Sequence, residues 1–305
     1  MNELLYDQQS LFPPEIQENE VLYVIGNGFD IAHGIESKYS DFERWCKTTA
    51  KNTSIFDSLF STQLDFWSNI EVALGDYDEE AILDFCKPDE EFDLDHSLSS
   101  SARIEDAPES ILKPALEELK EYFVEWVNFI NLKGIEDYLI LHKNAKYLSF
   151  NYTETLEKIY SIPNENVCHI HGCRLLNDDN YVFGHNNHRD TNSYGEDLPF
   201  FEENAFLSIL NYLNDFEKPI NEIIAAHTVF LDQLRDTKLV YVLGHSISEI
   251  DMPYFDYLLS IFTKQPVFIF SSNSTKDSQN IRSFISEKGI SQYKIIELDD
   301  LARNN

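Results

Sequence analysis

Two polar side chains of types that orient substrates or move protons stand at the ends of short apolar runs in this sequence. The side chains are Asn151 and His171, at the ends of the runs 146–150 (KYLSF) and 167–171 (VCHIH), and an earlier run lies at 21–25 (VLYVI). A histidine can transfer a proton near neutral pH, and an asparagine amide can orient a water molecule or a substrate amide. Short apolar runs are typical of parallel strands, whose carboxyl ends share one edge of a sheet. We therefore expect a site at that edge, with Asn151 and His171 as its catalytic pair.

The turn Gly26-Asn27-Gly28 separates the first run from a segment that begins like a helix and contains Asp30 and His33. Two glycines allow a close backbone approach, and the free N–H groups of a helix start can bind a phosphate. We predict that this segment binds the ligand, although a tight turn without a ligand fits the glycines equally well. A dehydrogenase fingerprint would place a third glycine at Ile31 and an acid about 20 positions on. Because 46–54 contains no acid, hydride transfer is not predicted.

The segment 239–255 (LVYVLGHSISEIDMPYF) repeats the order of apolar run, glycine, small polar residue and helix start. Gly244 and Ser246 are predicted to contact a second polar group of the same ligand. Asp251 precedes a Met-Pro pair and is expected at the start of a helix, because proline suits the first helical turn. We include all three residues in the predicted binding site.

Other interpretations of the polar residues near the second and third runs stay open. Asn151 can instead cap a following helix. Strand alternation places His169 and His171 on one face and Cys168 on the other, so convergence with Cys173 on one metal is not predicted. His169 lies deeper in its run and is expected to be a hydrogen-bonded core histidine.

The composition excludes several classes of protein. The chain has 305 residues and a formal net charge of −31, which opposes nucleic-acid binding, and it contains no basic cluster. It shows no signal peptide, no membrane-spanning apolar stretch and too few cysteines for a disulfide framework, so a cytoplasmic protein is expected. The acidic runs, including Asp76, Asp78 and Glu79, are interpreted as a solvated face or loop, with a metal site or a docking site for a basic partner as the alternatives.

The pattern of runs predicts one α/β domain over residues 1–305, with a mostly parallel, open, Rossmann-type sheet. Helical insertions are expected at about 43–140 and 190–237. Further strands are predicted at 181–184, 239–243, 266–271 and 293–298. Apolar periodicity predicts helices within 55–74, 111–130 and 200–237, and 86–110 is expected to be an irregular acidic linker.

Taken in order, these motifs resemble the AbiH family of phage abortive-infection proteins. The resemblance covers nearly the whole chain and rests on the segments IGNGFDIAHGIESKYSDF, FNYTETLE, HIHG, VFGHN and GHSISEIDMPYF. It implies a role in defence against phage, in which a second copy of the chain or a partner defence protein can take part.

The chain is also similar, more distantly, to the sirtuin-like NAD-binding fold. The matching positions are Gly26 to Asp30 with Gly34, Ser149 to Thr153, His171-Gly172, Phe183-Gly184, Gly244-His245-Ser246 and Asn273. This resemblance implies that Asn273 belongs to the binding site. Two departures matter. Thr153 stands where sirtuins have an aspartate, and the paired C-x-x-C zinc motif is missing, so no zinc is expected.

Sirtuin-like bacterial defence proteins without the zinc lobe hydrolyse NAD, and the resemblance therefore implies NAD hydrolysis, with NAD as the substrate and no cofactor. Two alternatives stay open. One is a catalytically silent nucleotide-binding sensor, which the Thr153 departure favours. The other is a metal-dependent nuclease or phosphohydrolase that uses the acidic cluster at 76–79.

Overall fold

The computed structural model describes residues 15–62, 65–87, 97–176, 180–190 and 200–303. The chain divides into two compact units. Unit 1 comprises Met1–Lys38, Phe129–Tyr181 and Pro219–Asn305, and unit 2 comprises Tyr39–Asn128 and Val182–Lys218. The two predicted helical insertions therefore meet in a unit of their own. Their outer parts, 129–140 and 219–237, belong instead to unit 1.

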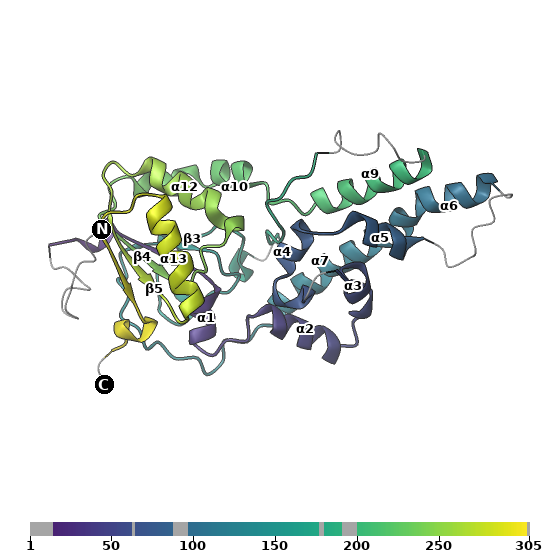
Figure 1. The fold of residues 1–305 in the computed structure, drawn as a ribbon. Helices are drawn as coiled ribbons and strands as arrows, with labels where there is room; N and C mark the ends of the chain where they lie inside the picture. The colour runs from purple at the N-terminus through teal and green to yellow at the C-terminus, as the bar shows by residue number, and fades with distance from the viewer. Residues whose placement is uncertain (1–14, 63–64, 88–96, 177–179, 191–199, 304–305) are drawn as a thin grey trace. The chain divides into compact units, whose positions relative to one another are not determined.

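Unit 1 is built on a six-stranded sheet in which every neighbouring pair of described strands is parallel (Figure 1). The strands are β1 (Val21–Ile25), β2 (Lys146–Ser149), β3 (Val167–His169), β4 (Leu239–Leu243), β5 (Val267–Ser271) and β6 (Tyr293–Ile296). Their order is β3-β2-β1-β4-β5-β6. The predicted parallel α/β sheet is confirmed. All residues of β1 and β4 are buried, as expected for central strands covered on both faces.

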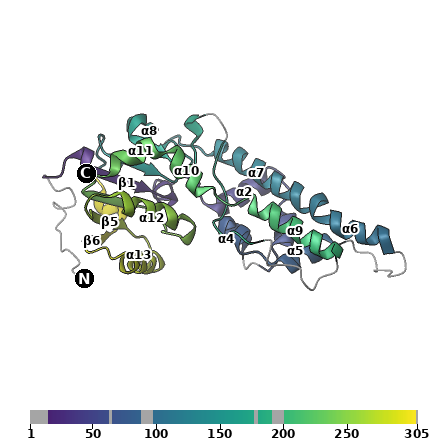
Figure 2. The same ribbon diagram turned by 90° about the horizontal axis from the view of Figure 1, so that it is seen from above.

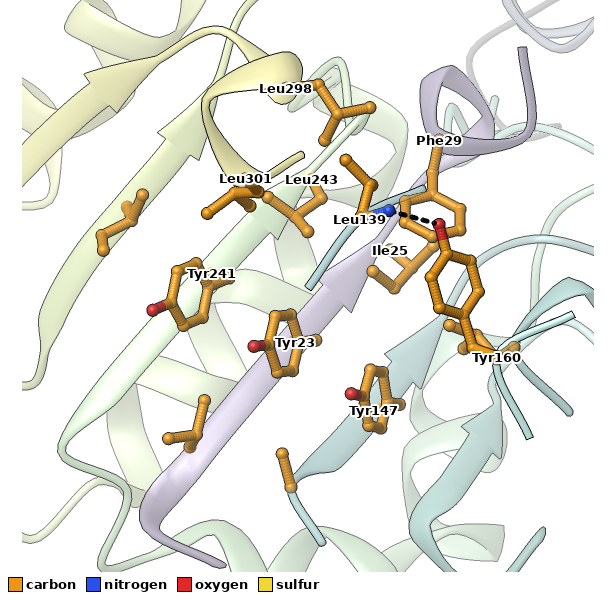
Figure 3. Close-up of a cluster of buried hydrophobic side chains, with 14 of the residues drawn as sticks. Tyr23, Ile25, Phe29, Leu139, Tyr147, Tyr160, Tyr241, Leu243, Leu298 and Leu301 are labelled. Atoms are coloured by element: carbon orange, nitrogen blue, oxygen red, sulfur yellow. Dashed lines mark hydrogen bonds between the residues drawn. The ribbon is translucent and has the colours of Figure 1, made fainter. Parts of the chain in front are cut away.

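One face of the sheet carries a stack of three fully buried tyrosines (Figure 3). Tyr23 lies in register with Tyr147 on β2 and with Tyr241 on β4. The ring centroids are 4.8 and 4.7 Å apart, and the rings of both pairs are nearly parallel. The loop residue His142 completes the arrangement, since its Nδ1 lies 2.7 Å from the Tyr23 hydroxyl. Leu139, Tyr160, Leu298 and Leu301 pack over this face.

The helices of unit 1 are α1 (Asn27–Ala32), α8 (Thr155–Lys158), α10 (Ile220–Ala226), α11 (Thr228–Leu231), α12 (Met252–Ile261) and α13 (Thr275–Glu287). α12 and α13 cover the face opposite the tyrosines (Figure 2). There Phe284 of α13 contacts Phe255 of α12 at 5.3 Å and Phe270 of β5 at 6.1 Å between ring centroids. Both faces of the sheet are thus closed by aromatic and aliphatic contacts, which leaves the strand ends for polar residues.

Unit 2 is helical, and its aromatic core fits the periodicity seen in the sequence. Its helices are α2 (Tyr39–Thr48), α3 (Ser54–Leu59), α4 (Ile70–Gly75), α5 (Glu79–Cys86), α6 (Ser97–Ser110), α9 (Phe200–Asn214) and most of α7 (Leu112–Phe129). The expected helix at 111–130 is therefore confirmed, whereas 55–74 is interrupted between α3 and α4. The predicted irregular linker 86–110 is wrong for 97–110, which is helical, and 88–96 lies outside the described residues.

The strand predicted at 181–184 is also wrong. Residues 181–184 form no strand pairing with any described residue, and the adjacent His185 makes a single bridge with Glu217. The apolar character of the segment has a different cause. Phe183 stacks on Phe123 of α7, with ring centroids 4.1 Å apart. The apolar character of 181–184 thus reflects packing of Phe183 on a helix and not strand formation. None of the described helices is both long enough and apolar enough to cross a membrane.

Candidate functional site

A buried carboxyl group lies at the carboxyl edge of the sheet, between the residues that follow β1 and those that follow β2. Asp30 on α1 is 1% exposed. Its Oδ2 accepts a hydrogen bond of 2.5 Å from the Thr153 hydroxyl, which in turn lies 3.0 Å from the Thr155 hydroxyl. The other oxygen, Oδ1, is buried and has no hydrogen-bond partner among the described residues. Oδ2 of Asp30 is therefore held by a hydrogen bond, whereas Oδ1 is available to accept one.

Burial raises the pKa of Asp30 from 3.8 to about 6. The hydroxyls of Thr153 and Thr155, the Asn151 side chain and the charge of Arg174 act in the opposite direction. Arg174 is itself held by a 2.7 Å ion pair with Glu154, so it stabilises the Asp30 carboxylate only from a distance. A carboxyl with a pKa near neutrality can exchange protons at the pH of a cell.

Asn151 lies against the same carboxyl and is 5% exposed. Its Oδ1 is a second buried oxygen without a hydrogen-bond partner in the described part of the chain. Its backbone is fixed, because its N–H donates to Ser149 Oγ at 3.2 Å and its carbonyl lies 3.2 Å from His169 Nδ1. The alternative role as a helix cap is wrong, since α8 begins at Thr155 with Glu154 before it. The structure thus brings the predicted residues Asp30 and Asn151 together.

His171 is buried in a second group, formed by aromatic rings. Its ring packs edge-on against Phe150 at 5.2 Å and against Tyr254 at 5.5 Å. Phe150 also contacts the ring of His245, at 4.6 Å. The carboxylate of Asp251 lies 3.6 Å from His245 Nε2 and makes no cap bond to α12, although it occupies the predicted position before that helix. The Phe150 ring therefore joins the residues after β2, β3 and β4.

β3 ends at His169, so the strand alternation used to place His171 does not reach that residue. The two histidines have different surroundings. His169 Nε2 lies 2.8 Å from Glu157 Oε1 in a buried pair. Burial lowers the pKa of His169, but hydrogen bonding to Cys173 and Glu157 outweighs burial and raises it to about 10. His169 is thus a hydrogen-bonded, charged residue with a structural partner. All four cysteines are free.

The glycine turn after β1 is packed directly on the loop after β4. The Gly26 amide donates to Leu243 O at 3.0 Å, and the Gly28 amide donates to Gly244 O at 2.7 Å. A Cβ atom at Gly28 would lie 2.7 Å from Gly244 O. Gly244 has a φ of +64°, and a Cβ atom there would lie 2.0 Å from the Phe29 nitrogen. These glycines are therefore explained by the contact of two loops, and their proposed contact with a phosphate stays a prediction.

The other predicted binding residues divide into two groups. Asn27 and His33 already have internal partners. The Asn27 side chain donates to Ser37 O at 2.8 Å, and the His33 ring lies 2.7 Å from Phe29 O. Ser246 and Asn273 are exposed after β4 and β5. The structure does not join these four residues to the pair formed by Asp30 and Asn151.

The sequence of the chain matches the family of bacteriophage abortive infection proteins called AbiH over residues 22–272. The chain belongs to the AbiH family. The match spans both units and includes every predicted site residue except Asn273. Membership implies a role in bacteriophage abortive infection. No curated protein and no solved structure matches this AbiH chain.

Sequence reasoning missed two participants in the site of this AbiH protein. The sequence shows Thr153 only as a departure from sirtuins, whereas its hydroxyl positions Asp30. The apolar pattern predicts Phe150 as a strand residue, whereas its ring contacts the His171 and His245 rings beyond the strand ends. The position of both directly after β2 is the signal that could have identified them, because residues just beyond parallel strands gather at one edge.

The acidic cluster of the alternative metal site lies in unit 2 of the AbiH protein. Its carboxylates have structural partners, since Asp78 accepts from the Ala81 amide at 3.0 Å at the start of α5, and Glu79 pairs with Arg189. No group of three metal-ligating side chains occurs among the residues that the structure describes.

Proposed function

We propose that this protein acts in abortive infection as a cytoplasmic enzyme that hydrolyses NAD to nicotinamide and ADP-ribose. The observation that carries the proposal is the pair of open, buried oxygens on Asp30 and Asn151 at the carboxyl edge of a parallel sheet. Buried polar atoms without partners are uncommon in proteins and often mark a functional site. Oxygen acceptors suit the donors of such a substrate, which are ribose hydroxyls, a carboxamide and an attacking water.

The position of the pair supports a nucleotide as the ligand. The strand order β3-β2-β1-β4-β5-β6 is that of dinucleotide-binding sheets, which bind ligands beyond the carboxyl ends of the strands where the order reverses. Here the order reverses between β1 and β4. Asp30 follows β1, and Asn151 follows the adjacent β2. The resemblance to sirtuin-like hydrolases adds NAD as the specific nucleotide.

The bond that breaks joins nicotinamide to the ribose, and its cleavage passes through an oxocarbenium-like state. Asn151 orients the attacking water or the carboxamide by hydrogen bonds. His171, on the aromatic side of the site, hydrogen-bonds a ribose hydroxyl or accepts a proton. Correct placement of such groups contributes about 10²–10⁴ to the rate.

Purified protein incubated with NAD, with free nicotinamide followed over time, tests the proposal. We expect the wild-type protein to release nicotinamide, either alone or after phage components are added as the activating signal. We expect Asn151→Ala to release none under either condition. NAD that stays intact under all these conditions contradicts the proposal. If NAD binding is then measurable, the protein is a nucleotide sensor. This second candidate is supported by Thr153, which stands where sirtuins have an aspartate.

A further inference from the structure

We propose that Asp30 is the general base of the reaction and that it takes the proton from the attacking water. The inference rests on the proposed function, and it assigns to Asp30 a step that motif resemblance leaves to a histidine. It starts from the geometry of one carboxyl group. Thr153 holds Oδ2, whereas Oδ1 has no donor among the described residues. Because both oxygens are shielded from solvent, an open one is a position for a ligand or a bound water.

Asn151 supplies the second half of the arrangement. Its Oδ1 is also buried and open, and its side chain lies against the Asp30 carboxyl. A water molecule that donates one hydrogen to each of these oxygens directs its lone pairs away from both. This orientation presents the oxygen of the water to an electrophilic carbon. The Asn151 amide N–H can donate to the Asp30 carboxylate, while the two Oδ1 atoms stay available as acceptors, and two such acceptors suit a molecule with two donors, which describes water.

Asp30 suits proton removal better than His171 does. The His171 ring packs edge-on between Phe150 and Tyr254, an environment that favours stacking or a hydrogen bond to a ribose hydroxyl. The charged groups around Asp30 are few. Arg174 acts from a distance while paired with Glu154. His33, the residue directly after α1, is bonded to Phe29 O and to the Tyr160 hydroxyl.

In the proposed step, Asp30 Oδ1 accepts a proton from water while the water oxygen bonds to the anomeric carbon of the ribose. The bond between that carbon and nicotinamide breaks, and its electron pair goes to the ring nitrogen. This nitrogen carries a positive charge in NAD and becomes neutral in nicotinamide. Asp30 then releases the proton to solvent, so that NAD and water give nicotinamide, ADP-ribose and one proton.

The test compares Asp30→Asn with the wild type in nicotinamide release and in NAD binding by calorimetry. The variant keeps the shape of the side chain and removes the base. We expect kcat to fall by about 10²–10⁴, with the Kd for NAD changed by less than about threefold. Asp137→Asn is the matched control. Asp137 is an exposed carboxylate of the same unit, paired with Arg303, and its substitution leaves turnover unchanged.

Thr153→Val gives a second readout if Asp30→Asn does not fold. Loss of the hydroxyl removes a hydrogen bond that lowers the pKa of Asp30, so the acid limb of the kcat profile moves to higher pH. Thr153→Ser restores the limb to its original position. A purely structural threonine would alter stability without moving that limb.

The outcomes separate the two proposals. Near-normal turnover in Asp30→Asn, or an acid limb that stays in place in Thr153→Val, overturns the role of Asp30 and leaves NAD hydrolysis standing. A wild-type protein that never consumes NAD overturns both. Loss of kcat with retained binding supports both.

Discussion

The hydroxyl of Thr153 donates a hydrogen bond to Oδ2 of Asp30, across a separation of 123 residues in the sequence. The bond connects the segment after β2 to the helix after β1. It holds one oxygen of a carboxyl that burial makes difficult to ionise. An ionised Asp30 therefore costs stability, and this cost is characteristic of a residue kept for function.

Asp30→Asn should stabilise the fold at pH 8. The pKa of Asp30 is raised by burial to about 6 in the folded chain, so the folded state disfavours the charged form that the unfolded chain has at that pH. The cost is small at pH 4, close to the ordinary pKa of 3.8, and is fully present well above pH 6. It amounts to at most about 3 kcal/mol, because one pKa unit corresponds to about 1.4 kcal/mol. Urea unfolding at pH 8 and pH 4 measures it, and an equal effect at both pH values would contradict this account.

The buried pair of His169 and Glu157 gives a dependence on pH of the opposite sign. The pKa of His169 is raised to about 10 in the folded chain, so the pair stabilises the fold fully below pH 6.5. That contribution declines as the pH rises from 6.5 towards 10. Wild-type stability should therefore fall over this range more steeply than that of His169→Gln. Thermal unfolding of both proteins at pH 6, 8 and 9.5 measures the difference, and parallel curves would show that the pair is not charged.

The sheet could be predicted because its strands are continuous apolar runs. The runs 21–25, 146–150 and 239–243 predict parallel neighbours or near-neighbours in one sheet, and β1 pairs with both β2 and β4. The segment 181–184 shows the limit of this signal, because Phe183 is apolar for packing on a helix. Short apolar runs do not reveal which surface buries them.

The positions of the candidate site residues at the sheet edge could be predicted, whereas their contacts could be predicted only in part. Asp30 and Asn151 were placed at the correct edge because they follow neighbouring strands. The contact between Thr153 and Asp30 could not be foreseen, since no local pattern links residues so far apart in the sequence. The sequence could not reveal why Gly26 and Gly28 are glycines. A bound phosphate and the backbone of a second loop both require that no side chain is present at these positions.

Substitution of the glycines distinguishes packing from ligand binding. Gly244→Ala should destabilise the fold by more than about 3 kcal/mol, because its Cβ would lie 2.0 Å from the Phe29 nitrogen and its φ is +64°. Gly34→Ala is the matched control. Gly34 has a similar φ of +77° but open space around it, so only backbone strain of about 1 kcal/mol is expected. Chemical denaturation of both variants without any ligand is the measurement, and equal losses would show that the loop contact is unimportant.

His171→Ala and Asn151→Ala should each abolish NAD loss, and any growth arrest on overexpression, while the protein stays folded. The two substitutions remove groups that the proposed mechanism places at the breaking bond, and Asn151 is uncharged, so its truncation breaks no buried ion pair. His169→Ala is the internal control from the same segment. It leaves the Glu157 carboxylate buried without its partner, so it should lower stability by about 3–5 kcal/mol and affect the chemistry less.

Melting temperature and nicotinamide release would be measured for all three variants. A His171→Ala protein with near-normal turnover, beside a stable His169→Ala protein without turnover, would reverse the assignment of the two histidines. His171 would then serve only to pack against Phe150 and Tyr254, and the buried His169–Glu157 pair would have to supply the charge that the reaction needs.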